Sequence, residues 1–186
     1  SFWSLGAVFA RGYSTAQSDI SWFITAAILG GALLQYPIGL LSDRIDRRKV
    51  MLLLCVGGAL ASVAVGMSAG HNWHLLAVFL FGAMVMPIYA MSLATAADVA
   101  HEGEFVEIGT SVLLLNAVGA VSAPLFLGKL MSSYGPPLLF WSFAGLCLLF
   151  TVYIALQLRD ARAVSVADQV PFTAAASEVA PASFDL

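Results

Sequence analysis

The residues of this chain that could do chemistry gather in one short link between two long apolar runs. Arg44, Arg47, Arg48 and Lys49 are four of the eight basic residues, and the acid Asp43 directly precedes them. A short basic link between two segments long enough to cross a membrane is typical of a cytoplasmic loop, because basic links are retained on that side. These charges therefore indicate membrane topology rather than catalysis.

The remaining polar residues form no pattern of a catalytic or metal site. His71 and His74 are three positions apart, but no carboxylate or cysteine near them completes a metal site, so a solvated loop is favoured. Cys55 and Cys147 each fall within an apolar run, where a buried thiol is favoured over a disulfide or metal ligand. The sequence has no Ser/His pair, His-Glu metal motif or intramembrane pair of acids, so we expect no enzyme and no cofactor.

Composition places the chain among membrane proteins. Of its 186 residues, 60% are hydrophobic and only 10% are charged, whereas soluble domains carry about 25% charged residues. We therefore expect an integral membrane protein with membrane lipid as a partner. The single basic cluster is too short to indicate nucleic-acid binding. The sequence predicts an all-α fold, a polytopic bundle of membrane helices.

Apolar runs separated by polar turns give the expected order of helices. Five runs reach the length of about 20 residues that a bilayer requires, and a sixth is shorter. The full spans are predicted at residues 20–41, 50–68, 75–97, 105–131 and 138–158, and the partial one at 1–10. We interpret the chain as a fragment of a longer one, with a helical bundle over residues 1–162. Residues 163–186 lack helical periodicity, which predicts a disordered tail.

The basic residues also predict how the spans are oriented. If the link at residues 44–49 is cytoplasmic, alternation of the spans places six basic residues on that side and two outside. The six are Arg44, Arg47, Arg48, Lys49, Arg159 and Arg162, and the two are Arg11 and Lys129. The carboxy-terminus is then expected to be cytoplasmic.

A few small and polar residues inside the spans indicate contacts between helices. Gly30 and Gly31 lie in the middle of the first full span, where small residues allow close helix packing. Asn116 lies deep in an apolar run, and its amide could line a cavity or form an interhelical hydrogen bond, with the bond slightly favoured. Gln35 and Tyr89 leave the same two alternatives open.

The charged link resembles the signature loop of the major facilitator superfamily. That pattern is Gly, three residues, Asp, Arg or Lys, any residue, Gly, Arg, then Arg or Lys. It matches here at Gly39, Asp43, Arg44, Arg47 and Arg48, and departs at position 46, where an aspartate replaces glycine and puts the tightness of the turn in question. The pieces at residues 9–12, 37–44 and 87–89 are similar to the YcaD-type branch of bacterial inner-membrane permeases.

The resemblance implies the fold and function of a secondary transporter. In this superfamily two six-helix halves rock about a central cavity, which gives alternating access. The loop's place after one partial and one full span implies the carboxy-terminal half, with a missing amino-terminal six-helix half as its partner. The implied activity is transport of an unknown small organic solute across the bacterial inner membrane. A non-transporting fragment, or an assembly partner of another membrane protein, is the alternative.

The resemblance also implies roles for the loop residues. Asp43 would lie at a helix N-terminus in the other half, where a carboxylate is favoured by about 0.3–1 kcal/mol. Arg44, Arg47 and Arg48 would make charge contacts that hold one conformation, and Gly39 would let its helix approach a neighbour closely. The alternative for the basic residues is that they only determine topology.

Overall fold

Every element of the described part of the chain is an α-helix. The computed structural model describes residues 2–12, 17–68, 71–98 and 105–158. The helices are α1 (Phe2–Arg11), α2 (Gln17–Ser42), α3 (Arg47–Ser68), α4 (His74–Asp98), α5 (Phe105–Tyr134) and α6 (Leu138–Gln157). Helices α2 to α6 are each long and apolar enough to cross a membrane, whereas α1 has 10 residues. The predicted bundle of five full spans and one shorter helix is therefore confirmed.

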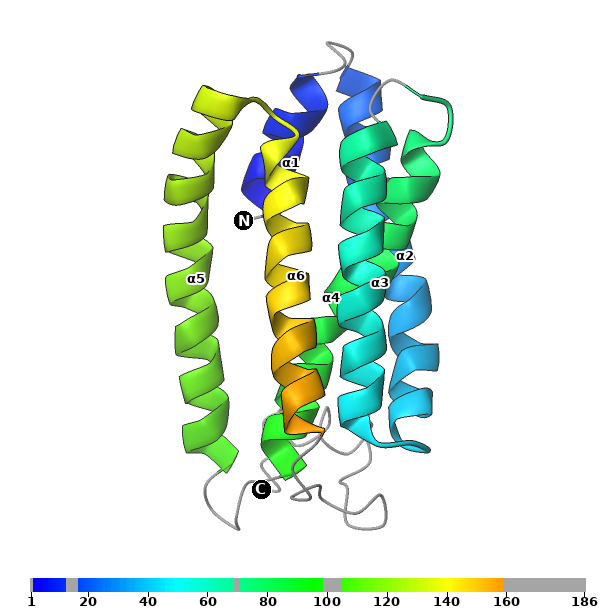
Figure 1. Cartoon of the computed structure of the whole chain (residues 1–186), viewed down its shortest axis with the longest axis vertical. Coiled ribbons are helices and arrows are strands. Elements are labelled where there is room, and N and C mark those ends of the chain that lie inside the picture. The colour runs from blue at the N-terminus through cyan, green and yellow to red at the C-terminus, as the bar shows by residue number, and fades with distance from the viewer. Residues whose placement is uncertain (1, 13–16, 69–70, 99–104, 159–186) are drawn as a thin grey trace, which may run out of the picture.

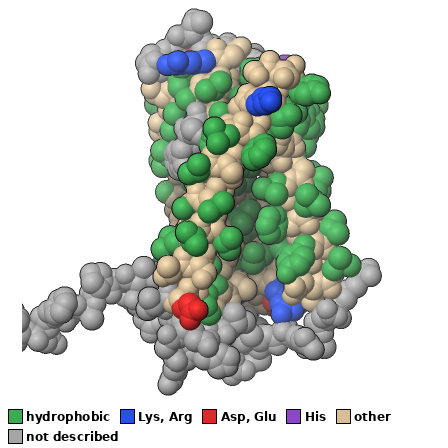
Figure 2. All heavy atoms as spheres, turned by 90° about the vertical axis from the view of Figure 1, so that its left-hand side faces the viewer, with side chains coloured by type: hydrophobic (Ala, Val, Ile, Leu, Met, Phe, Trp, Pro, Cys, Tyr) green, Lys and Arg blue, Asp and Glu red, His purple; other side chains and the backbone are tan. Residues whose placement is uncertain are grey.

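The helices lie side by side along the long axis of the molecule (Figure 1). The α2–α3 link and the end of α6 share one end, and the short α5–α6 turn lies at the other. Figure 2 shows one face of the molecule, where charged side chains lie near the two ends and hydrophobic side chains cover the belt between them. A bilayer requires this distribution, because its hydrocarbon core does not solvate charge.

Two glycines allow α2 and α4 to touch along their backbones. A Cβ at Gly30 would overlap the carbonyl oxygen of Phe79, and a Cβ at Gly82 would overlap the carbonyl oxygen of Ala27. The contacts are reciprocal, with one glycine on each helix, so neither position accepts a larger residue unless the helices separate. The sequence predicts the close contact at Gly30 but not its counterpart on α4.

Helix α3 lies between α4 and α6 and packs extensively against both. A Cβ at Gly58 would lie 3.2 Å from Val85 Cγ2 on α4 and 3.3 Å from Cys147 Sγ on α6. Both distances are shorter than ordinary van der Waals contact, so this glycine allows three helices to meet. The buried hydroxyl of Ser62, one turn later, donates to the carbonyl of Gly58 at 2.6 Å and is thereby satisfied.

An aromatic cluster joins α1, α2, α4 and α6 at the end opposite the α2–α3 link. Phe9 and Phe140 meet edge to face with ring centroids 4.6 Å apart, and His74 stacks on Phe23 at 5.7 Å. The Nδ1 of His74 lies 2.9 Å from the hydroxyl of Ser68. The sequence favours a solvated loop for this histidine, but the ring is half-buried because it begins α4 and packs among aromatic rings.

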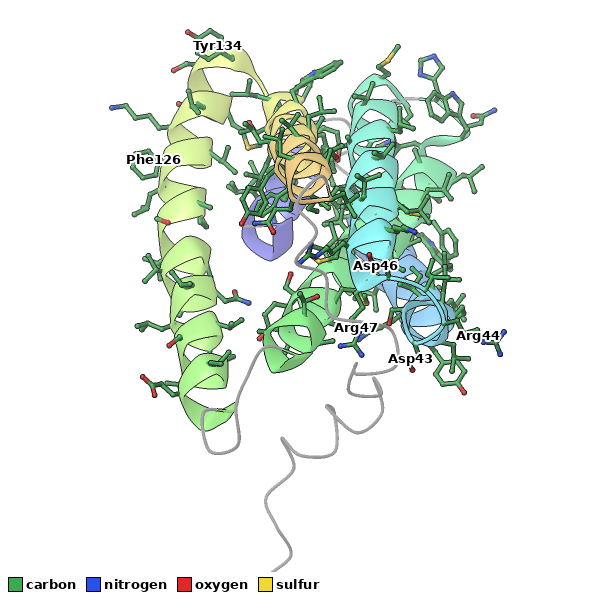
Figure 3. The ribbon with its side chains drawn as sticks, turned by 60° about the horizontal axis from the view of Figure 1, so that its bottom comes forward. Asp43, Arg44, Asp46, Arg47, Phe126 and Tyr134 are labelled. Atoms are coloured by element: carbon green, nitrogen blue, oxygen red, sulfur yellow. The ribbon has the colours of Figure 1, made fainter. Side chains whose placement is uncertain are left out.

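Helix α5 stands apart from the rest of the bundle, at the left of Figure 1. None of its side chains from Glu107 to Leu130 is buried. Phe126 and Tyr134 project outward from it in Figure 3, and residue Phe126 is 73% exposed. Added Cβ atoms at Gly109 and Gly119 would meet nothing within 4 Å. Helix α5 is therefore loosely packed within the described part of the chain.

The structure extends several helices beyond their predicted boundaries: α2 begins at Gln17 rather than at residue 20, α3 begins at Arg47 rather than at 50, and α5 ends at Tyr134 rather than at 131. Arg47, Arg48 and Lys49 form the first turn of α3, whereas the sequence predicts them in the preceding link. The link itself is thereby reduced to residues 43–46. The predicted tail at 163–186 lies outside the described residues.

Candidate functional site

The signature loop, defined here as residues 39–48, begins inside the last turn of α2. Gly39 is buried, and its carbonyl accepts both the Ser42 hydroxyl at 2.7 Å and the backbone N–H of Asp43 at 3.2 Å. These two bonds satisfy a carbonyl that the helix end would otherwise leave without a donor. Asp43 therefore follows directly on the carboxyl end of a helix, where the helix dipole disfavours a negative charge.

Asp46 caps the helix that follows. Its Oδ1 accepts the backbone N–H of Arg48 at 2.9 Å, and its carbonyl accepts the N–H of Lys49 at 2.9 Å. This is the geometry of an N-cap, which stabilises a helix by about 1 kcal/mol. No residue other than glycine has a positive φ in the described chain, so this turn does not need the backbone freedom of glycine. The aspartate at position 46 thus replaces glycine without straining the turn.

Arg47 is the buried centre of the loop. Only 2% of its surface is exposed, and its Nη1 donates to the carbonyl of Ala94 on α4 at 2.9 Å. Its Nη2 lies 3.5 Å from Oδ1 of Asp43, whose side chain is 27% exposed. The guanidinium therefore connects the link after α2 to the far end of α4, and it offsets the unfavourable position of the Asp43 carboxylate.

The other two arginines of the signature loop point in different directions. Arg48 donates from Nη1 to the carbonyl of Gln157 at 3.3 Å, at the carboxyl end of α6, where a cation is favoured by the helix dipole. Arg44 is exposed and projects away from the bundle in Figure 3. The three matching arginines thus have separate roles, with one buried against α4, one placed at α6 and one outside.

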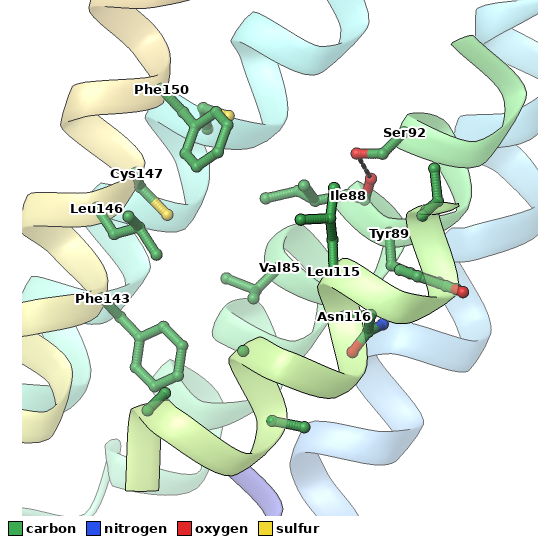
Figure 4. Close-up of a pocket in the computed structure, with 15 residues that line it drawn as sticks. Val85, Ile88, Tyr89, Ser92, Leu115, Asn116, Phe143, Leu146, Cys147 and Phe150 are labelled. Atoms are coloured by element: carbon green, nitrogen blue, oxygen red, sulfur yellow. Dashed lines mark hydrogen bonds between the residues drawn. The ribbon is translucent and has the colours of Figure 1, made fainter. Parts of the chain in front are cut away.

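A pocket of about 720 Å³ lies between α5 and the helices α3, α4 and α6. Helix α5 contributes one face that recurs at helical spacing, with the polar residue Asn116 among the small or apolar residues Val112, Leu115, Gly119, Ala120 and Ala123. The opposite wall is formed by Cys55, Val85, Ile88, Tyr89, Ser92, Phe143, Leu146, Cys147 and Phe150. Figure 4 shows side chains of α6 pointing across the pocket toward α4 and α5.

Two of the three polar residues selected from the sequence line this pocket. Tyr89 of α4 and Asn116 of α5 both border it (Figure 4), whereas Gln35 is exposed on α2 and does not. Within the described part of the chain no hydrogen bond joins the Asn116 amide to another residue, so the interhelical bond that the sequence slightly favours is absent there. Ser92 also lines the pocket, but its hydroxyl donates to the carbonyl of Ile88 at 2.8 Å.

Helix α4 connects the pocket to the signature loop. Its residues Tyr89 and Ser92 line the pocket, and Ala94, half a turn further along, accepts the bond from Arg47. Thr95 follows, with its hydroxyl 3.7 Å from the sulfur of Met51 on α3. A displacement of this end of α4 would therefore change both the pocket wall and the loop contact.

Sequence reasoning missed several of these contacts. An aspartate before a helical run is an N-cap signal that was available for Asp46. No residue type marks Ala94 or Gln157, because each acts through a backbone carbonyl. No sequence pattern marks the pocket wall either, because residues such as Phe143 do not differ in type from the other apolar residues of a span.

Membrane-length helices joined at one end by a charged loop, with a mostly apolar pocket between them, define a polytopic membrane protein. The family model of the Major Facilitator Superfamily matches residues 1–181, and the chain belongs to this family of transporters. The chain is similar to an uncharacterized MFS-type transporter named YcaD from Escherichia fergusonii, with 26% identity over 165 residues. That match covers 89% of this chain and 42% of the relative.

Similar matches come from other bacteria. An uncharacterized MFS-type transporter of Yersinia enterocolitica is 26% identical over 144 residues, which cover 77% of this chain and 36% of the relative. One from an Enterobacter strain is 26% identical over 164 residues, which cover 87% and 41%. The chain thus spans about two fifths of the length of the curated relatives it matches. No solved structure matches the chain.

Proposed function

We propose that this chain is the carboxy-terminal half of a secondary active transporter that moves a small organic solute by alternating access. The observation that carries the proposal is the bond from buried Arg47 to the carbonyl of Ala94, which ties the signature loop to a pocket-lining helix. Membership of the superfamily and the transporter names of the relatives support transport. The share of each relative that the chain covers supports a half, with a six-helix amino-terminal half as the partner.

In the proposed mechanism the loop holds one state of the rocking cycle. Arg47 and Arg48 fix α3 to the ends of α4 and α6, so these helices move together. The Asp43 carboxylate faces Arg47 and is 27% exposed, and in this mechanism its exposed part contacts a helix N-terminus of the other half. Separation of the halves would break that outer contact and keep the inner one, so the charge on Asp43 would stabilise one state selectively.

The proposed location is the bacterial inner membrane, with the signature loop and the carboxy-terminus in the cytoplasm. The excess of basic residues at the end that carries Arg44, Arg47, Arg48 and Lys49 supports this orientation. Lys129 and Arg11 belong to the opposite side in this arrangement.

The test replaces Asp43 by asparagine in a protein that joins this chain to its amino-terminal half. Saturable uptake of solutes from a panel of sugars, amino acids, carboxylates and uncharged aromatic compounds is measured in reconstituted vesicles. Asp43→Asn keeps the shape of the side chain and removes its charge, so transport is expected to fall about five- to thirtyfold, as a change of about 1–2 kcal/mol between two states requires.

Asp46→Asn is the matched control, because asparagine caps a helix about as well as aspartate and the same charge is lost only three residues from Asp43, at the position that does not match the signature pattern. It is expected to leave transport close to that of the parent. Equal transport by the two variants at matched protein levels would mean that the loop only sets topology. Absence of saturable uptake for every solute in the parent would instead favour a non-transporting assembly partner.

A further inference from the structure

The pocket beside α5 has the size and lining of a small-molecule site. Its volume of about 720 Å³ lies within the range of about 300–1,000 Å³ that ligand pockets occupy. Its described lining residues are mostly aliphatic and aromatic, and none is Asp, Glu, Lys, Arg or His. A charged ligand would lose its hydration here and find no counter-charge, so the lining selects against ions.

The polar groups of the pocket are few and unequally available. The Ser92 hydroxyl is already used by the carbonyl of Ile88, at 2.8 Å. The Asn116 amide borders the pocket and has no hydrogen-bond partner within the described chain, so its N–H and C=O groups can serve a ligand. Tyr89 borders the same space from α4. The pocket is therefore mostly apolar, and the Asn116 amide is the hydrogen-bonding group on its α5 wall.

The packing of α5 indicates how a ligand would be accommodated. Gly119 lies on the pocket face of α5, one turn from Asn116, and a Cβ there would meet nothing within 4 Å. The glycines of α2 and α4 allow backbones to touch, whereas this glycine borders open space. An aromatic ring could therefore lie flat against the α5 backbone, opposite Phe143 and Phe150 of α6.

We propose that this pocket binds an uncharged, largely apolar small molecule with one hydrogen-bond acceptor, held by the Asn116 amide and the α6 rings. Such chemistry belongs equally to a solute and to an uncharged membrane lipid. Binding at this pocket can be measured with this chain alone and without transport. The binding proposal can therefore be wrong while the proposed transport function is right.

Benzophenone is the probe, because it has two rings, one carbonyl acceptor and its own photoreactivity. Radiolabelled benzophenone is irradiated with the 186-residue chain in detergent, and the labelled residues are mapped by mass spectrometry. Saturable labelling is expected at residues of α5 and α6 that border the pocket, such as Leu115 and Phe143. Labelling by 4-benzoylbenzoate, which adds a carboxylate, is expected to be at least about tenfold weaker.

Two variants distinguish labelling within the pocket from labelling of the exposed surface of α5. Gly119→Trp fills the pocket and is expected to lower labelling there at least about fivefold, whereas Gly109→Trp, on the same helix beyond the pocket, leaves it unchanged. Both glycines have open space around a Cβ, so both variants are expected to fold. Asn116→Leu is expected to weaken saturable labelling about fivefold, the factor for one lost hydrogen bond.

The outcomes decide the proposal and the source of the ligand. Non-saturable label spread over the exposed residues of α5, or equal labelling by the two probes, would overturn it, as would equal labelling of the Gly119 and Gly109 variants. If saturable labelling persists in vesicles of phosphatidylcholine but is displaced when diacylglycerol is added, the site takes an uncharged lipid. If diacylglycerol does not compete, it takes a solute.

Discussion

Helices α4 and α5 are consecutive in the chain, and both are long and apolar enough to cross a membrane, yet they are packed in opposite ways. Helix α4 lies against α2 and α3 and buries residues such as Val78, Phe81 and Met91. Helix α5 touches its neighbours at few places, and none of its side chains from Glu107 to Leu130 is buried. The two helices differ in what surrounds them rather than in composition.

This comparison shows that apolarity does not predict burial in a membrane protein. Lipid tails are as apolar as leucine, so a helix gains little by exchanging lipid for protein, and its position depends on close packing. Both helices contain glycine, but Gly82 on α4 meets a backbone whereas Gly119 on α5 meets open space. A small residue therefore produces packing only where another helix crosses it.

The largest expected effect concerns the crossing of α2 and α4. Gly82→Leu places a side chain where the carbonyl of Ala27 already lies, so the two helices must separate. We expect a loss of about 3 kcal/mol of unfolding free energy, at the upper end of overpacking effects. Thermal unfolding in detergent, followed by circular dichroism, measures the change.

Gly119→Leu is the counterpart on α5. Its side chain enters open space, and the change in unfolding free energy is expected to stay within about 0.5 kcal/mol. Comparable losses for the two variants would show that α5 is packed as tightly as α4, and the contrast between the helices would be wrong.

A smaller effect is expected at the signature loop, which joins the packed helices at their ends. Arg47→Leu removes the bond to the Ala94 carbonyl and the contact with Asp43, so a loss of about 2 kcal/mol is expected. Arg44→Leu removes the same charge from an exposed position and is expected to cost within about 0.5 kcal/mol. Thermal unfolding of the two variants under one condition gives the difference, and equal values would exclude a structural role for the buried guanidinium.

The smallest effect is local to the first turn of α3. Asp46→Ala removes the side-chain acceptor of the Arg48 N–H, which is expected to cost about 1 kcal/mol, whereas Asp46→Asn retains an acceptor. Hydrogen exchange at the amide of Arg48 should accelerate about fivefold in the alanine variant if the cap governs local opening. An unchanged rate would mean that packing against α4 and α6, rather than the cap, holds this turn.

Much of the fold can be predicted from the sequence, because the length of an apolar run and the position of a charged link are properties of adjacent residues. Runs of about 20 apolar residues predict the five spans, and the glycine pair at Gly30 and Gly31 predicts a close helix contact. The charged pattern from Gly39 to Arg48 identifies the family, which the family model confirms. Each of these signals can be read without knowing which helices are neighbours.

The candidate site is less predictable because it depends on pairings between distant parts of the chain. Arg47, Arg48 and Arg44 look alike in the sequence, and only the positions of α4 and α6 separate the buried one from the exposed one. Asn116 leaves two alternatives open until the residues across from it are known. The pocket lining consists mainly of residue types that occur throughout the spans, so no local pattern marks it.

The reciprocal glycines of α2 and α4 also limit how this protein can change over time. Glycine is the only amino acid without a Cβ, so every codon change that alters Gly30 or Gly82 adds an atom at a place already occupied by a backbone oxygen. No substitution removes atoms from the opposing backbone, so the added atom can be admitted only if the two helices separate. We therefore expect substitutions at Gly30 and Gly82 to be rejected during evolution. Gly109 and Gly119 of α5, which border open space, can be substituted when selection acts on what the molecule binds.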